Sequence, residues 1–139
     1  GATAVVDLSM QFADRGYQCD VELVSQVLGR LMDIQVRDFA LGTHNAKTFD
    51  IYWNMWLYLL RVAPAGFVAP VACLFATLAY ERGDSELAYR ALDRATADDP
   101  KYSLTLLLRR VFGSGWPAAA FAAMRVELHP KVTAGIFES

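Results

Sequence analysis

The chain has 139 residues, with 55% apolar and 20% charged side chains and a formal net charge of -2. At this length one hydrophobic core forms without disulfide or metal staples, and the composition excludes an intrinsically disordered chain. Acidic and basic residues are nearly balanced, 15 against 13, so the positive field that nucleic-acid binding needs is missing. DNA and RNA are therefore not expected partners.

The first third of the chain predicts three short helices. Apolar residues recur there at spacings of three and four, and no segment alternates as a strand would. A first helix is expected from Ala4 to Arg15, with Gly16 at its C-cap. Asp20 is placed to cap the next helical stretch, which Gly29 and Asp33 would divide into two helices.

An aromatic helix is expected after a polar loop at residues 42–47. Thr48 is placed to cap it, and its sequence from Phe49 to Val62 is FDIYWNMWLYLLRV. Apolar side chains occur nearly all round this helix, so we expect it at the centre of the fold. The alternative is that another polypeptide covers one of its faces.

Trp53 and Trp56 lie three residues apart on this helix. Tryptophan is enriched at the energetic centres of protein interfaces, so the pair is a candidate partner-binding surface. The competing interpretation places both indoles in the core.

Residues 62–80 carry no charge and reach the length of a membrane span. Pro64, Gly66 and Pro70 interrupt the first half, which leaves only residues 71–80 as uninterrupted apolar helix. That remainder is too short to cross a bilayer. A buried helix with Pro70 in its first turn is expected, and no membrane partner.

Three further helices are predicted in the last part of the chain. Asp84 or Ser85 begins an amphipathic helix that stops before Pro100. Another begins near Ser103, and the last begins at Pro117. Residues 1–139 are thus expected to form one all-α domain, an array of seven or eight short helices.

Residues 69–102 have the length and spacing of a tetratricopeptide unit. Gly83 falls at the turn, Ala88 and Ala95 at the small positions, and Pro100 at the boundary. Ala72 stands where such a unit has a large aromatic residue, and the neighbouring segments do not repeat the pattern. We expect one tetratricopeptide-like helical hairpin and not an array of three.

The residue types that carry most chemistry are sparse. His44 and His129 have no carboxylate or cysteine at metal-ligand spacing, so both are expected to be exposed or capping. Cys73 is predicted to be a small buried hydrophobe, and neither it nor Cys19 is expected to act as a nucleophile. No phosphate-loop, nucleophile-elbow or zinc motif occurs. No catalytic residue, cofactor or metal is therefore predicted.

Charged residues near the end of the amphipathic helix have two possible roles. Asp98 and Asp99 are expected in a solvated turn, with attraction of a cation or a basic partner as the alternative. Arg109 and Arg110 are expected on the wet face of the following helix, with binding of an anion or a partner as the alternative.

Four short motifs mark the segment from residue 68 to 117: AYERGD at 79–84, A-x-x-A-L-x-x-A at 88–95, DDPKYSL at 98–104 and G-x-G-W-P at 113–117. Together they resemble the C-terminal helical part of the actinobacterial domain-of-unknown-function family 4192. Members of that family are typically larger and have a more β-rich N-terminal portion, so the resemblance implies a C-terminal fragment. It implies no activity and no cofactor.

The leading expectation is a cytoplasmic helical protein-protein interaction or assembly module without catalytic activity of its own. Its candidate partner-binding residues are Trp53, Trp56, Arg109 and Arg110. One alternative is an accessory domain that completes an enzyme active site located in a missing N-terminal portion. That alternative requires a polar cleft built from Arg109, Arg110, Asp98 and His44. The other is a homodimerisation domain that associates through the aromatic helix.

Overall fold

The structure is a computed structural model that describes residues 2–15 and 21–125. These residues form an all-α fold of eight helices and contain no strand. The helices are α1 (Ala2–Arg15), α2 (Val21–Arg30), α3 (Ile34–Thr43), α4 (Phe49–Val62), α5 (Val68–Glu81), α6 (Ser85–Asp98), α7 (Ser103–Gly113) and an unlabelled helix at residues 118–125. The expected all-α class and helix number are confirmed.

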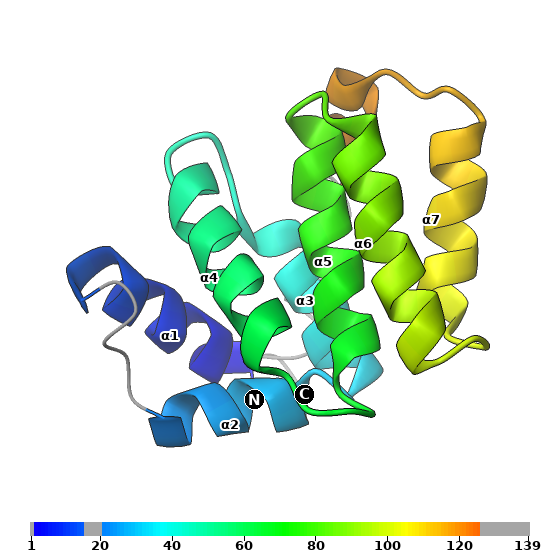
Figure 1. Cartoon of the computed structure of the whole chain (residues 1–139). Helices are drawn as coiled ribbons and strands as arrows, with labels where there is room; N and C mark the ends of the chain where they lie inside the picture. Colours follow the sequence, from blue (N-terminus) through cyan, green and yellow to red (C-terminus); the bar gives the residue numbers. More distant parts are fainter. Residues whose placement is uncertain (1, 16–20, 126–139) are drawn as a thin grey trace.

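Helix α5 lies at the centre of the array (Figure 1). It packs against α3 and α4 on the N-terminal side of the fold and against α6 and α7 on the C-terminal side. Every residue from Val68 to Tyr80 is buried, because this helix is apolar all round and can hide its surface only between other helices. No described helix is both long and apolar enough to cross a membrane.

The expectation that α4 is the central helix is wrong. Its buried stripe includes Tyr52, Trp56 and Leu59, whereas Asn54 and Arg61 on other faces are exposed. Two exposed polar side chains give α4 a solvent face, which α5 lacks between Val68 and Tyr80. The boundaries predicted for α4 are nevertheless those observed.

Helices α5 and α6 form a tight antiparallel hairpin (Figure 1). Alanines at buried positions of both helices let the backbones approach closely, and Gly83 makes the turn with a φ of 88°, where glycine is favoured. Helical pairing of residues 68–98 is therefore as expected. Likeness to a tetratricopeptide unit stays a prediction.

Side-chain capping is observed at Asp33, which the sequence predicts as a division between two helices, and at Asp84, which it predicts as a cap, but not at Thr48. Asp33 accepts hydrogen bonds from the backbone N–H groups of Gln35 and Val36, and so separates α2 from α3. Asp84 accepts one from Leu87 and begins α6. Thr48 occupies the cap position of α4, but its hydroxyl makes no cap bond and accepts one from the N–H of Asn45. The expected caps Gly16 and Asp20 lie outside the described residues.

Candidate functional site

Three buried polar side chains meet at the C-terminal end of α5. His44 follows α3 and is 2% exposed, Glu81 is the last residue of α5, and Arg125 is the last described residue of the helix at 118–125. The His44 Nε2 atom lies 3.0 Å from Oε2 of Glu81. His44 lies 37 residues before Glu81 and Arg125 lies 44 residues after it, so one carboxylate joins three distant parts of the chain.

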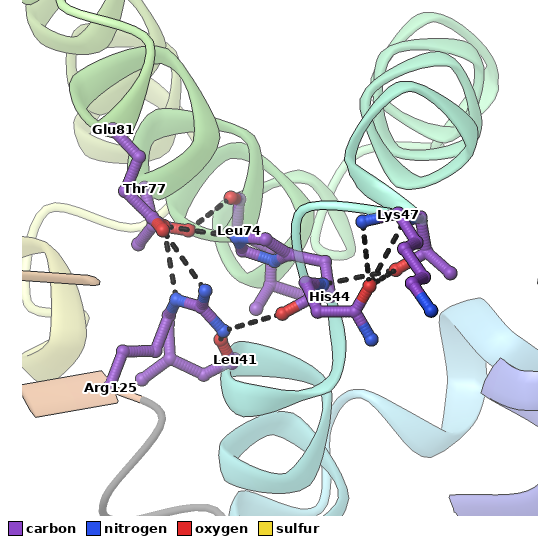
Figure 2. A network of polar contacts seen from close by, with 9 residues as sticks. Leu41, His44, Lys47, Leu74, Thr77, Glu81 and Arg125 are labelled. Atoms are coloured by element: carbon purple, nitrogen blue, oxygen red, sulfur yellow. Dashed lines mark hydrogen bonds and ion pairs between the residues drawn. The ribbon is translucent and has the colours of Figure 1, made fainter. Parts of the chain in front are cut away.

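The guanidinium of Arg125 binds the carboxylate of Glu81 through two parallel hydrogen bonds (Figure 2). Its Nε donates to Oε2 of Glu81 and its Nη2 to Oε1, each at 3.0 Å. The Nη1 group donates to the backbone carbonyls of His44 at 3.0 Å and Leu41 at 3.4 Å. Arg125 therefore fastens both the end of α5 and the end of α3 to the helix at residues 118–125.

Burial and charge set the protonation states of this cluster. Burial alone would raise the pKa of Glu81. The hydrogen bond from His44 and the charge and hydrogen bonds of Arg125 outweigh this effect, so the pKa of Glu81 is lowered from its ordinary value. Burial, assisted by the positive charge of Arg125, lowers the pKa of His44 despite its bond to Glu81. At neutral pH the cluster is an ionised carboxylate held by one guanidinium and one neutral imidazole.

The imidazole of His44 is enclosed by aromatic rings. It meets Phe49 edge-on with 5.7 Å between ring centroids and lies 6.4 Å from the ring of Tyr52. With Nε2–H donated to Glu81, its Nδ1 is an acceptor that is buried and unpaired among the described residues. Because both carboxylate oxygens of Glu81 are also engaged, the arrangement suits anchoring of the chain better than proton transfer.

A cleft of about 1020 Å³ opens beside this cluster. His44, Glu81 and Arg125 contribute to its lining, and Phe49 supplies an aromatic edge. The helix at residues 118–125 provides a wall of small side chains, namely Ala118, Ala119, Ala122 and Ala123. The described lining is mainly apolar, and the buried ion pair of Glu81 and Arg125 forms part of it.

The two tryptophans of α4 have different environments. Trp56 is fully buried and cannot meet a partner, so the two indoles do not form an exposed pair. Trp53 is half-buried: its ring lies 4.7 Å from that of Phe75, and the guanidinium of Arg82 stacks over it at 4.7 Å. The indole of Trp53 is therefore partly used within the fold.

The sequence predicts that Asp98 lies in a solvated turn, and this prediction is wrong. Its Oδ1 accepts the N–H of Gly66 at 2.7 Å, and its Oδ2 accepts those of Val68 and Ala69 at 3.1 and 3.0 Å. Phe67 at the N-cap of α5 has no side-chain acceptor, so a carboxylate from the end of α6 satisfies these donors. It also lies at the positive end of the α5 dipole.

The remaining polar candidates do not gather at one site. Arg109 pairs with Asp93 at 2.8 Å and also donates to Thr96, whereas Arg110 is exposed on α7. His44 and Asp98 lie at opposite ends of α5, which is about 20 Å long. The polar cleft that an accessory catalytic role required is therefore not formed by these residues.

His44 occupies the C-cap position of α3, as one of the two expectations had it, but it is buried and hydrogen-bonded to Glu81, so the expectation of an exposed histidine is wrong for it. Cys73 is buried as expected, and burial raises the pKa of its thiol to about 11, which disfavours the nucleophilic thiolate. Within the described ranges no cluster of His, Cys, Asp and Glu could hold a metal ion. Cys19 and His129 lie outside those ranges.

Comparison with models of known protein families shows the family of this chain. The model of the family described as Domain of unknown function (DUF4192) matches residues 1–119. The chain belongs to this family. The match extends the resemblance seen in residues 68–117 to the helices α1 to α4. No curated protein and no solved structure matches the chain.

Proposed function

We propose that this DUF4192 chain is a helical protein-interaction module without catalytic activity of its own, and that the cleft beside the helix at residues 118–125 receives its partner. The cleft is the observation that carries the proposal: it measures about 1020 Å³ and its lining is mostly apolar. A concave apolar surface of this kind suits the apolar face of a helix from another protein.

The small wall favours a helical occupant. Ala118, Ala119, Ala122 and Ala123 recur at positions that share one side of a helix, so a second backbone can approach this side closely. Phe49 across the cleft supplies the larger apolar contact. Such a surface binds by shape and burial of apolar area.

The buried ion pair gives the wall a fixed position before a partner arrives. Arg125 belongs to the same helix as the four alanines, and it is held by two bonds to Glu81 and two to backbone carbonyls. A wall that is already ordered loses less conformational entropy on binding. The cluster is thus a supporting element of the proposed site.

Filling the cleft tests the proposal. Ala119 and Ala123 are exposed, so A119W and A123W add bulk in the cleft without displacing buried atoms. A97W on the exposed side of α6 is the matched control. Proteins from the source organism that the native chain retains should be lost with A119W and A123W and kept with A97W, as quantified by mass spectrometry. Equal retention by all four chains would contradict the proposal.

A further inference from the structure

The imidazole of His44 fits its position in the cleft wall only in its neutral form. Its Nε2 lies 3.0 Å from the carboxylate of Glu81, which can only accept a hydrogen bond, so the proton lies on Nε2. The other ring nitrogen, Nδ1, is buried and has no hydrogen-bond partner among the described residues. Protonation would turn this atom into a buried donor that no described residue accepts, which is costly.

The charges around His44 also oppose a second cation. Arg125 already neutralises Glu81 through two hydrogen bonds. Two aromatic rings of α4 face the imidazole, and burial raises the pKa of the titratable one, Tyr52, so its phenol stays neutral. Lys47, in the loop that follows His44, is exposed and positive as well. An imidazolium here would leave the buried cluster with a net charge of about +1.

We propose that protonation of His44 opens the wall of the cleft, so that weak acid releases a partner bound at neutral pH. An imidazolium is driven toward water, and residue 44 also supplies the carbonyl that accepts the Nη1–H of Arg125 at 3.0 Å (Figure 2). Displacement of residue 44 therefore removes one bond of Arg125 together with the bond between the imidazole and Glu81. Release of a partner rests on the function proposed above, whereas opening of the wall does not.

The size of the opening follows from the pKa of His44 in the two states. In an open wall the imidazole has its ordinary pKa of about 6.5, and in the closed wall its pKa is lowered by burial. Between pH 7.0 and pH 5.5 the ratio of open to closed chains should therefore rise several-fold, with a limit of about eightfold for one group. Glu81 adds nothing in this range, because its pKa is lowered from 4.5.

Hydrogen exchange at pH 7.0 and pH 5.5 measures this opening, when each rate is divided by that of the unstructured peptide. Protection at residues 118–125 should fall several-fold in the native chain, with a smaller fall in α6. In His44→Gln, whose amide can still donate to Glu81, protection of the wall should be the same at both pH values. An unchanged native wall, an equal fall in α6, or an equal fall in H44Q would overturn the inference.

A second measurement does not depend on the folding of H44Q. Nitrogen-15 chemical shifts of the native imidazole report which atom carries the proton and at which pH the ring titrates, and the spectrum of His129→Gln tells the two histidines apart. We expect an Nε2–H tautomer at pH 7.0 and a pKa of His44 below 6.5. An Nδ1–H tautomer, or a pKa above 6.5, would contradict the opening.

Failure of the opening and failure of partner binding give different results. A cleft that receives no partner would show equal retention by the tryptophan variants at neutral pH, whatever the wall does in acid. A wall that does not open would keep its protection at pH 5.5, whatever the cleft binds. Proteins retained by the native chain at pH 7.0 should elute at pH 5.5 and stay bound to H44Q, and proteins that stay bound to both chains would contradict release.

Discussion

The two ends of α5 are fastened by different chemistry, although the helix between them is uniformly apolar and buried. At its N-terminal end a partly exposed carboxylate, Asp98, accepts three backbone N–H groups. At its C-terminal end a buried carboxylate, Glu81, is held by His44 and Arg125. The first contact completes a helix end, while the second joins three segments and supports the cleft.

This difference predicts which end tolerates mutation. A helix end that loses an acceptor can turn to water when it lies near the surface. A buried carboxylate that loses its guanidinium has no such replacement, so the free-energy cost of removing its charge from water is no longer offset. The C-terminal end should therefore be the more sensitive of the two.

The largest effect is expected from Arg125→Met. This change keeps much of the side-chain volume but leaves the buried charge of Glu81 without its main partner, so the free energy of unfolding should fall by about 3–5 kcal/mol. Urea denaturation at neutral pH measures this change.

Arg90→Met is the matched control. Arg90 pairs with Glu86 at 2.8 Å, but these side chains are 71% and 78% exposed. Its loss should therefore change the free energy of unfolding by less than about 0.5 kcal/mol. An R125M chain as stable as the R90M chain would show that the cluster does not hold the fold together.

A smaller effect is expected from Asp98→Ala. Loss of three acceptor contacts at the start of α5 should lower the free energy of unfolding by about 1–2 kcal/mol, as for a lost helix cap. Asp99→Ala, which removes only the turn bond to Lys101, should cost less than about 0.5 kcal/mol. Equal losses from D98A and D99A in thermal denaturation would remove Asp98 as the anchor of this end.

The smallest effect is a pH dependence that comes from His44. Because its pKa is lowered in the fold, the unfolded chain binds more protons than the folded one once the pH falls below about 6.5. Stability from this site is complete above that pH and declines below it, with a slope of at most about 1.4 kcal/mol per pH unit. The lowered pKa of Glu81 has its effect only below the ordinary value of 4.5.

His44→Gln should flatten this slope between neutral pH and about pH 5.5. His129 is present in both chains, so its contribution cancels in the comparison. Urea midpoints measured at several pH values give the slope for each chain. A native chain whose stability rises as the pH falls through this window would have the wrong sign.

The helices were largely predictable because their signals are local. The apolar pattern of residues 49–62 gave α4 its observed bounds, and Asp33 and Asp84 cap the helices that follow them. Which of the two helices α4 and α5 is more deeply buried was not predictable in this way. Both are rich in apolar residues, and their depth depends on which neighbours cover them.

The candidate site was harder to predict because its contacts join distant segments. Neither Glu81 nor Arg125 is among the residues that the sequence predicts to form a site, although each is a charged residue next to a long apolar or alanine-rich stretch. A charge at such a position needs a partner, which is a usable signal, but the sequence does not say which partner it finds. The solvated turn expected for Asp98 is wrong for the same reason, since the backbone donors that its carboxylate accepts lie about 30 residues earlier.

The contact between Glu81 and Arg125 should fix the helix at residues 118–125 as the wall of the cleft. Hydrogen exchange of native chain and Glu81→Gln tests it most directly, with peptides from residues 118–125 and from α6 compared in the same sample. We expect exchange in E81Q to accelerate more at residues 118–125 than in α6. Equal acceleration in both segments, or none at residues 118–125, would contradict the account.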